Sequence, residues 1–144
     1  MNTTFKDRQE ATVTPTEAFR KFVKSDEFPC IGAKSAMVRD QLMIAEFGEI
    51  DSAAGDIKLR LALETFIDQL DFDSPVVQSF VAIFTGPNDL LEDEFEHALW
   101  NRLQSLHNLD VVEGRGWAEN ADRDPQSAHF SMGLLGEAFF VIGL

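Results

Sequence analysis

The sequence has little of what several common protein classes require. Its single cysteine, Cys30, cannot form an internal disulfide, which is typical of a protein from a reducing compartment. It has no tyrosine, so binding patches built from hydroxyl-bearing aromatics are excluded. We expect its 13 Phe and 2 Trp to pack in the apolar interior. The opening residues have no apolar segment of a signal peptide, and no run approaches the roughly 18 apolar residues of a membrane span. We therefore expect a soluble, cytoplasmic protein with no membrane partner.

Basic residues are also scarce. The chain has 12 Lys+Arg against 25 Asp+Glu, a formal net charge of -13. Phosphate backbones and anionic lipids repel an acidic surface. Nucleic acid is therefore excluded as a partner, and a cationic ligand is favoured. The imbalance is uneven, because residues 1–40 carry a net +1 and residues 41–144 a net -14.

The length of 144 residues is that of one domain, and helix and strand patterns alternate along it. Thr14, Pro15 and Glu17 form a capping box that predicts a helix over 15–25. Residues 32–39 suit a short helix or a structured loop, and we favour the loop. The other expected elements are a strand over 42–47, a helix over 51–71, a strand over 76–84, a helix from Asn88 or Asp89 to His107, a loop over 108–127, and a hairpin of 129–134 with 138–144. This order predicts an α+β domain over 14–144 with a mixed sheet, about three helices and a C-terminal β-hairpin, after a disordered segment 1–13.

Standard catalytic motifs are absent: the sequence has no phosphate loop, GxGxxG, CxxC, HExxH or GxSxG. Cys30, with Lys34 four residues on, is a candidate thiolate ligand or nucleophile, and the alternative is a small buried apolar residue. A cysteine nucleophile lacks a credible neighbouring base. The nucleophile is therefore the least favoured of these roles for Cys30.

The histidines and tryptophans give weaker signals. His97 and His107 lie ten residues apart, nearly on opposite faces of one predicted helix, so we interpret both as surface residues. His129 opens a strand after a long loop, where it suits either a ligand or a structural histidine. Trp100 and Trp117 are both candidates to line a pocket, and core packing explains Trp100 at least as well.

Three stretches taken together resemble the YqcI/YcgG family. They are Phe28-Pro29-Cys30 with residues 32–36, then 93–110 (DEFEHALWNRLQSLHNLD), then Asp124-Pro125 leading to 129–131 and 136–144 (GEAFFVIGL). The resemblance covers about residues 17 to 144.

The resemblance implies a haem protein, because characterised members of this group use haem and O2 to N-hydroxylate the guanidino group of arginine or an arginine-like amino acid. An electron donor is then a required partner, and a homo-oligomer is compatible with the sequence. The implied haem contacts are Phe28, Pro29, Cys30, Trp117 and His129, with the iron ligand left open between Cys30 and His129.

A guanidinium is a planar cation that carboxylates bind in a bidentate manner. The acidic residues near the matched stretches, Glu92, Glu96 and Asp124, are therefore the expected substrate contacts.

Family members continue beyond the final apolar strand with a His-Pro step, an arginine-rich stretch and a second half of similar size. This resemblance, and the apolar strand 138–144 at the end of the chain, lead us to expect a domain truncated at its C-terminal end. The alternative hypothesis is a non-catalytic interaction module of the same fold, with the hairpin as the edge that faces a partner.

Overall fold

The computed structural model describes residues 12–144, so most of the predicted disordered segment 1–13 lies outside the described residues. The elements in chain order are α1 (Pro15–Val23), α2 (Ile31–Val38), β1 (Leu42–Glu49), the short 3-10 helix η1 (Ala53–Gly55), α3 (Asp56–Asp68), β2 (Ser79–Gly86), α4 (Glu92–Val112), β3 (Met132–Leu134) and β4 (Glu137–Phe139). In this part of the chain, no helix is both long and apolar enough to cross a membrane.

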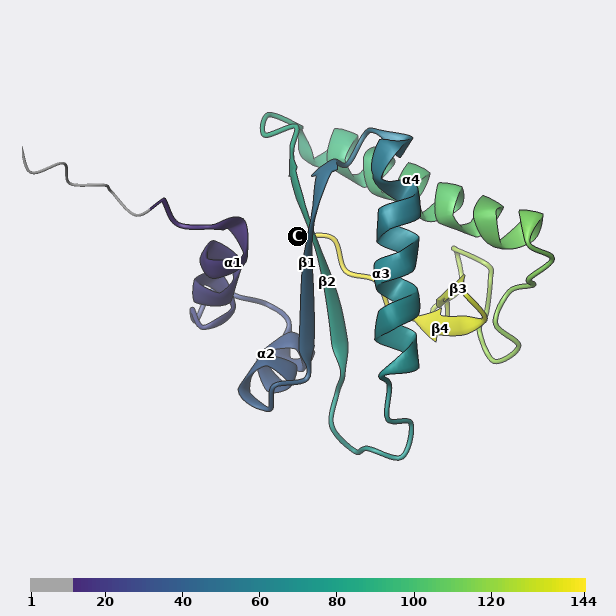
Figure 1. Ribbon diagram of the computed structural model, residues 1–144, viewed down its shortest axis with the longest axis horizontal. Helices are drawn as coiled ribbons and strands as arrows, with labels where there is room; N and C mark the ends of the chain where they lie inside the picture. Colours follow the sequence, from purple (N-terminus) through teal and green to yellow (C-terminus); the bar gives the residue numbers. More distant parts are fainter. Residues whose placement is uncertain (1–11) are drawn as a thin grey trace, which may run out of the picture.

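The centre of the fold is a two-stranded parallel sheet. β1 pairs with β2 from Leu42 opposite Ser79 to Glu49 opposite Gly86. Parallel neighbours need a long crossover, and α3 supplies it. α1 and α2 lie on one side of this sheet, and α3, α4 and the β3–β4 hairpin lie on the other (Figure 1).

The α+β class is confirmed, but the predicted mixed sheet is wrong. β1 and β2 form one sheet, while β3 and β4 form a separate antiparallel hairpin. The hairpin turn is at Leu135 and Gly136, both with positive φ, as a tight two-residue turn requires. Its strands are shorter than expected because the residues before Met132 turn away: the Phe130 N–H donates to the Ser127 carbonyl. Among the described residues, no strand pairs with residues 140–144.

The predicted loop over 32–39 is also wrong, since these residues form most of α2. Cys30 is its N-cap, and the Cys30 Sγ accepts a hydrogen bond from the Ala33 N–H at 3.4 Å. Cysteine is not among the usual capping residues, so the sequence carried no recognised start signal. The structure consequently has four α-helices rather than about three over its described residues.

Other boundaries differ from the predicted ones by a few residues. The capping box of Thr14 and Glu17 is present in α1. α4 begins at Glu92 because the Glu94 carboxylate accepts from the Leu91 N–H at 2.8 Å, and it runs on to Val112. α3 begins later than expected because η1 precedes it.

The main core lies between the sheet, α3, α4 and the hairpin. Its buried members are Phe47, Leu59, Leu63, Leu103, Leu106, Met132, Leu134 and Leu135. A second, smaller cluster on the other side of the sheet holds Val23, Phe28 and Ala33. The fold therefore has one large core and one small one, separated by β1 and β2.

Candidate functional site

An open pocket of about 460 Å³ lies between the C-terminal half of α4 and the loop that follows it. This volume is within the range of small-molecule sites. We call it the α4 pocket. It is lined by Trp100, Leu103, Gln104, His107, Val111, Arg115, Gly116, Trp117, Arg123, Pro125, Phe130 and Met132.

Aromatic rings form one wall of the α4 pocket. The Trp117 ring meets the His107 ring edge-on, with centroids 5.2 Å apart, and Phe130 lies 5.8 Å from Trp100 and 6.3 Å from Trp117. Trp117 can pack against β3 because residue 133 is glycine: a Cβ there would lie 2.9 Å from the Trp117 ring. Both candidate tryptophans, Trp100 and Trp117, thus line this pocket, whereas the haem contact expected of Trp117 stays a prediction.

Two ring nitrogens in this wall have no hydrogen-bond partner among the described residues. They are the His107 Nδ1 and the Trp117 Nε1, and both are buried. A buried polar atom without a partner costs about 1–3 kcal/mol. His107 is half-buried beside Trp117 rather than on the surface, so the prediction for it is wrong, whereas His97 is exposed as expected.

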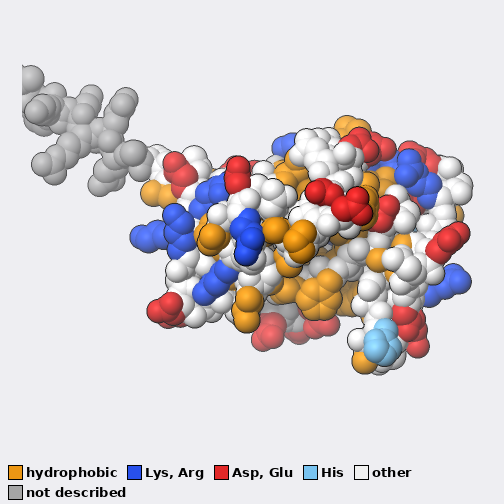
Figure 2. All heavy atoms as spheres, turned by 90° about the horizontal axis from the view of Figure 1, so that it is seen from below, with side chains coloured by type: hydrophobic (Ala, Val, Ile, Leu, Met, Phe, Trp, Pro, Cys, Tyr) orange, Lys and Arg blue, Asp and Glu red, His pale blue; other side chains and the backbone are white. Residues whose placement is uncertain are grey.

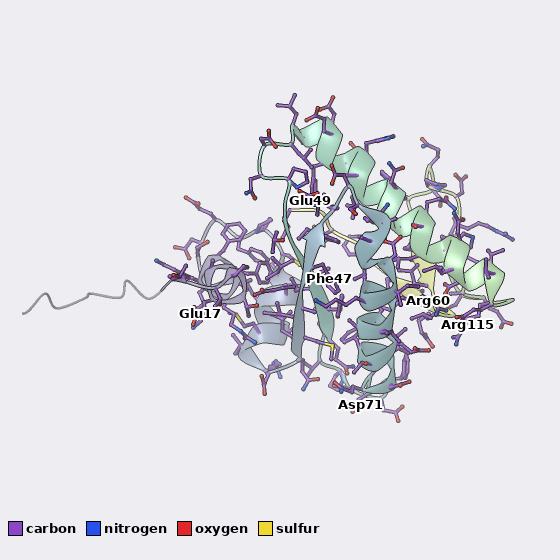
Figure 3. The ribbon with its side chains drawn as sticks, turned by 45° about the horizontal axis from the view of Figure 1, so that its top comes forward. Glu17, Phe47, Glu49, Arg60, Asp71 and Arg115 are labelled. Atoms are coloured by element: carbon purple, nitrogen blue, oxygen red, sulfur yellow. The ribbon has the colours of Figure 1, made fainter. Side chains whose placement is uncertain are left out.

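The charged side chains that line the α4 pocket are both cationic. Arg115 follows α4 and lies near Arg60 of α3, as Figure 3 shows. Glu113 links these two arginines, at 2.6 Å from Arg60 and 3.7 Å from Arg115. Hydrogen bonding to Glu113 raises the pKa of Arg60 above its ordinary value, with burial opposing this and Asp110 adding to it. Arg123, the other cation, forms no ion pair with any residue in 12–144.

The loop beside the pocket is held by its own turns. The Asp122 carboxylate accepts from the Asp124 N–H at 2.9 Å, and the Asp122 carbonyl accepts from the Ser131 N–H. The hydrogen bond with Ser127 lowers the pKa of the Asp122 carboxyl, followed in size by the bond from the Asp124 N–H. These contacts fix the backbone between Arg123 and Phe130.

Cys30 lies in a different place, on the α1 and α2 side of the sheet. Its thiol is half-buried close to Gly32 and Val77: a Cβ added at position 32 would lie 3.9 Å from the Cys30 Sγ and 3.6 Å from the Val77 Cγ1. Phe28 is 4% exposed and meets the rings of Phe19 and Phe22 edge-on. Pro29, between Phe28 and Cys30, is exposed.

Apolar side chains around Cys30 lie open on the surface. Ile31 is 83% exposed, Val38 83% and Val77 48%. We call Ile31, Val38, Val77 and the neighbouring Phe22 the α2 apolar surface. Figure 2 shows hydrophobic side chains on the face seen from below, with basic side chains gathered over the α1 and α2 end.

The structure does not bring the predicted site residues together. Cys30 caps α2, whereas His129 is exposed in the loop before β3, on the other side of the sheet. Glu92 and Glu96 are exposed in the first turns of α4. Eleven residues separate Glu96 from His107, about 16 Å along a helix. Asp124 alone of the expected acids adjoins the α4 pocket, between two residues that line it.

Within residues 12–144, no group of three or more His, Cys, Asp and Glu side chains is arranged to hold a metal ion. A haem iron needs one protein ligand rather than such a cluster. Cys30, His107 and His129 are therefore single-residue candidates for that ligand.

Sequence reasoning missed most of the α4 pocket. It did not single out Arg115, Arg123 or Phe130, and it placed His107 at the surface. A usable signal was present, because His107 follows Leu103 and Leu106 on the stripe that faces the core. The arginines carried no such pattern, since only the folded loop brings them beside Trp117.

Comparison with known proteins places the chain in a family. The profile of the YqcI/YcgG family matches residues 19–144. The chain is 29% identical over 122 residues to the uncharacterized protein YcgG of Bacillus subtilis (strain 168), an alignment that covers 82% of this chain and 47% of the relative. It is 29% identical over 124 residues to the uncharacterized protein YqcI of the same organism, covering 83% and 47%.

The chain thus spans about half the length of the curated relatives it matches. No solved structure matches it significantly.

Proposed function

Because the chain belongs to the YqcI/YcgG family, we propose that the protein is a haem-dependent oxygenase that N-hydroxylates the guanidino group of arginine or an arginine-like amino acid. The family resemblance supplies the cofactor and the reaction. An electron donor and O2 are the other reactants of this proposal.

The surroundings of Cys30 fit a haem. The observation that carries the proposal is a half-buried thiol beside the exposed α2 apolar surface. A haem is a large, mostly apolar plane that needs one axial ligand and one open face. When bound, it supplies oxygen activation. Cys30 would hold the iron, and Phe28 would support the Cys30 backbone from beneath through its packing in the small core.

The histidines fit this role less well. The His129 side chain is exposed, and only its backbone N–H is anchored, donating to the Ser127 hydroxyl at 3.1 Å. His107 is better enclosed, but it lies with Trp117 in the α4 pocket. We therefore assign the iron to Cys30 in this proposal.

The proposed substrate contacts are carboxylates. Glu92, Glu96 and Asp124 are exposed and free of ion pairs with residues 12–144, so each can receive a guanidinium. They are spread along α4 and its loop, on the other side of the sheet from Cys30. Their proposed role is therefore to attract the cationic substrate over a longer range, not to orient the guanidinium at the iron.

The test is a haem titration of the protein expressed from its complete gene, followed by turnover with arginine, O2 and a chemical reductant. We expect a saturable Soret band and a product one oxygen atom heavier than arginine, detected by mass spectrometry. A protein that is folded by circular dichroism yet gives no Soret band would refute the proposal.

A second candidate is a non-catalytic interaction module. The observation that favours it is the apolar tail after β4, where Phe140 is 84% exposed and Leu144 59%. Haem-independent binding to a partner chain that is lost in Phe140→Ser would support this candidate over the oxygenase.

A further inference from the structure

The α4 pocket has a charge opposite to that of the chain. The protein carries a formal net charge of -13, with 25 acidic residues. Among the described residues, however, no Asp or Glu lines this pocket, whereas Arg115 and Arg123 do. A local cationic site on an acidic protein attracts anions and is a poor site for a guanidinium.

Arg123 is the arginine that is free to bind. Arg115 is already partly engaged, with Glu113 at 3.7 Å, Glu64 at 3.8 Å and the Leu135 carbonyl at 3.5 Å. Arg123 has no such partner within 12–144, and its backbone position is fixed by the Asp122 and Asp124 turn. A fixed guanidinium with open donors binds carboxylates in a bidentate geometry.

The aromatic wall indicates a flat ligand. Trp100, Trp117 and Phe130 line the pocket as a continuous series of rings with centroids 5.8 Å and 6.3 Å apart. Trp100 is 41% exposed, so part of this wall is in contact with water. A planar apolar group stacked on it would remove that area from water and add aromatic contacts.

The unpartnered nitrogens also point to a ligand. The His107 Nδ1 and the Trp117 Nε1 belong to adjacent rings that line the same pocket. The Trp117 Nε1 is only a donor, and an imidazole nitrogen can be one. Both nitrogens are buried beneath neighbouring atoms of the pocket wall, so only a ligand that displaces those atoms would contact them directly. A carboxylate, which only accepts, is the complement of such donors.

From these four observations we infer that the α4 pocket is a binding site for a small planar carboxylate. The carboxylate pairs with Arg123, and the planar group packs against the wall of Trp100, Trp117 and Phe130, whose rings are tilted by 51° and 43° at the two contacts. This site is separate from the proposed haem surface at Cys30, which lies on the other side of the sheet.

The test uses benzoate and benzamidine, which have the same ring and opposite charges. The chain has only two tryptophans, both in this pocket, so the two indole N–H signals of a ¹⁵N-labelled sample report on it directly. Trp117→Phe assigns them. We expect benzoate to shift the Trp117 signal saturably and benzamidine to bind at least about tenfold more weakly, the loss of roughly one charged hydrogen bond. Equal binding of the two probes would overturn the proposal.

Two variants sharpen the result. Arg123→Gln should weaken benzoate binding about tenfold or more, and Arg123→Lys should restore part of it. Arg39→Gln, which removes an exposed arginine next to α2, should leave the affinity unchanged. Benzoate binding that is indifferent to Arg123→Gln, or that falls equally in Arg39→Gln, would show a non-specific charge effect and refute the site. Acetate binding as tightly as benzoate would refute the stacking component.

Discussion

The two sides of the central sheet are built differently. The side that carries α3, α4 and the hairpin has eight buried apolar residues in one cluster and all three buried charged residues of the described chain: Asp56, Arg102 and Asp110. The α1 and α2 side has a cluster of three, Val23, Phe28 and Ala33, beneath an exposed apolar surface.

The charged residues on the first side stabilise it through specific pairs. Arg102 donates to Asp56 at 2.5 Å and to the Ser52 carbonyl at 2.9 Å. Asp110 accepts from the Leu135 N–H at 2.8 Å and from Arg60 at 3.1 Å, which ties α4 to α3 and to the hairpin turn. The α3 and α4 side is thus stabilised by ion pairs and hydrogen bonds within the chain. The side with Cys30 instead leaves apolar side chains exposed, where a ligand or partner could bind.

The largest effect should come from removing Asp110, which is 1% exposed. Asp110→Ala leaves the Leu135 N–H and the largely buried Arg60 without their shared partner, so we expect a loss of about 3–5 kcal/mol in the free energy of unfolding, measured in urea. The matched control is Glu113→Ala, which removes the exposed partner of the same arginine and should cost less than about 1 kcal/mol. Equal losses in the two variants would contradict a special role for the buried pair.

The next effect compares the two cores directly. Leu106→Ala in the large core should cost about 2–5 kcal/mol and reduce amide hydrogen-exchange protection throughout the domain. Phe28→Ala in the small core removes a buried ring and two edge-on contacts, so it should destabilise α1 and α2 by about 3–5 kcal/mol, with lost protection confined to those helices. Global loss of protection in Phe28→Ala would mean that the two sides form one cooperative unit rather than two regions of different stability.

The smallest effect concerns the loop beside the α4 pocket. Hydrogen bonds from Ser127 and the Asp124 N–H lower the pKa of Asp122 in the folded protein. The ionised carboxylate therefore stabilises the turn at any pH above the unfolded Asp pKa of about 3.9. This stabilisation is lost as the pH falls through the lower, folded pKa. Ser127→Ala should raise the Asp122 pKa toward its ordinary value in an NMR titration, while Ser25→Ala, in the turn after α1, should not. An unchanged Asp122 pKa in Ser127→Ala would show that the Ser127 hydroxyl is not the main cause of the lowering.

The sequence predicted the helices and strands that are indicated by residues close together in the chain. Thr14, Pro15 and Glu17 indicated α1, and the alternation from Leu42 indicated β1. For α2 the sequence allowed a helix but favoured a loop, because the residue that caps this helix is a cysteine. It overextended the hairpin because apolar pattern alone does not show that residues 127–131 turn away from β4.

The candidate sites differ in the same way. Phe28-Pro29-Cys30 is continuous in sequence and was found by resemblance. The α4 pocket combines His107 of a helix with Arg123 and Phe130 of a loop, and only tertiary structure joins them. Asp110, which sequence reasoning left in a loop, is instead a buried residue of α4 that joins this helix to α3 and to the hairpin turn.

The most direct test of the account is the comparison of haem binding by three variants of the protein from its complete gene: Cys30→Ala, His129→Ala and His107→Ala. If Cys30 holds the iron, Cys30→Ala shifts or abolishes the Soret band, and the other two variants retain the band of the unsubstituted protein. A Soret band that survives Cys30→Ala and is lost in His107→Ala would contradict the account, because it would place the haem in the α4 pocket.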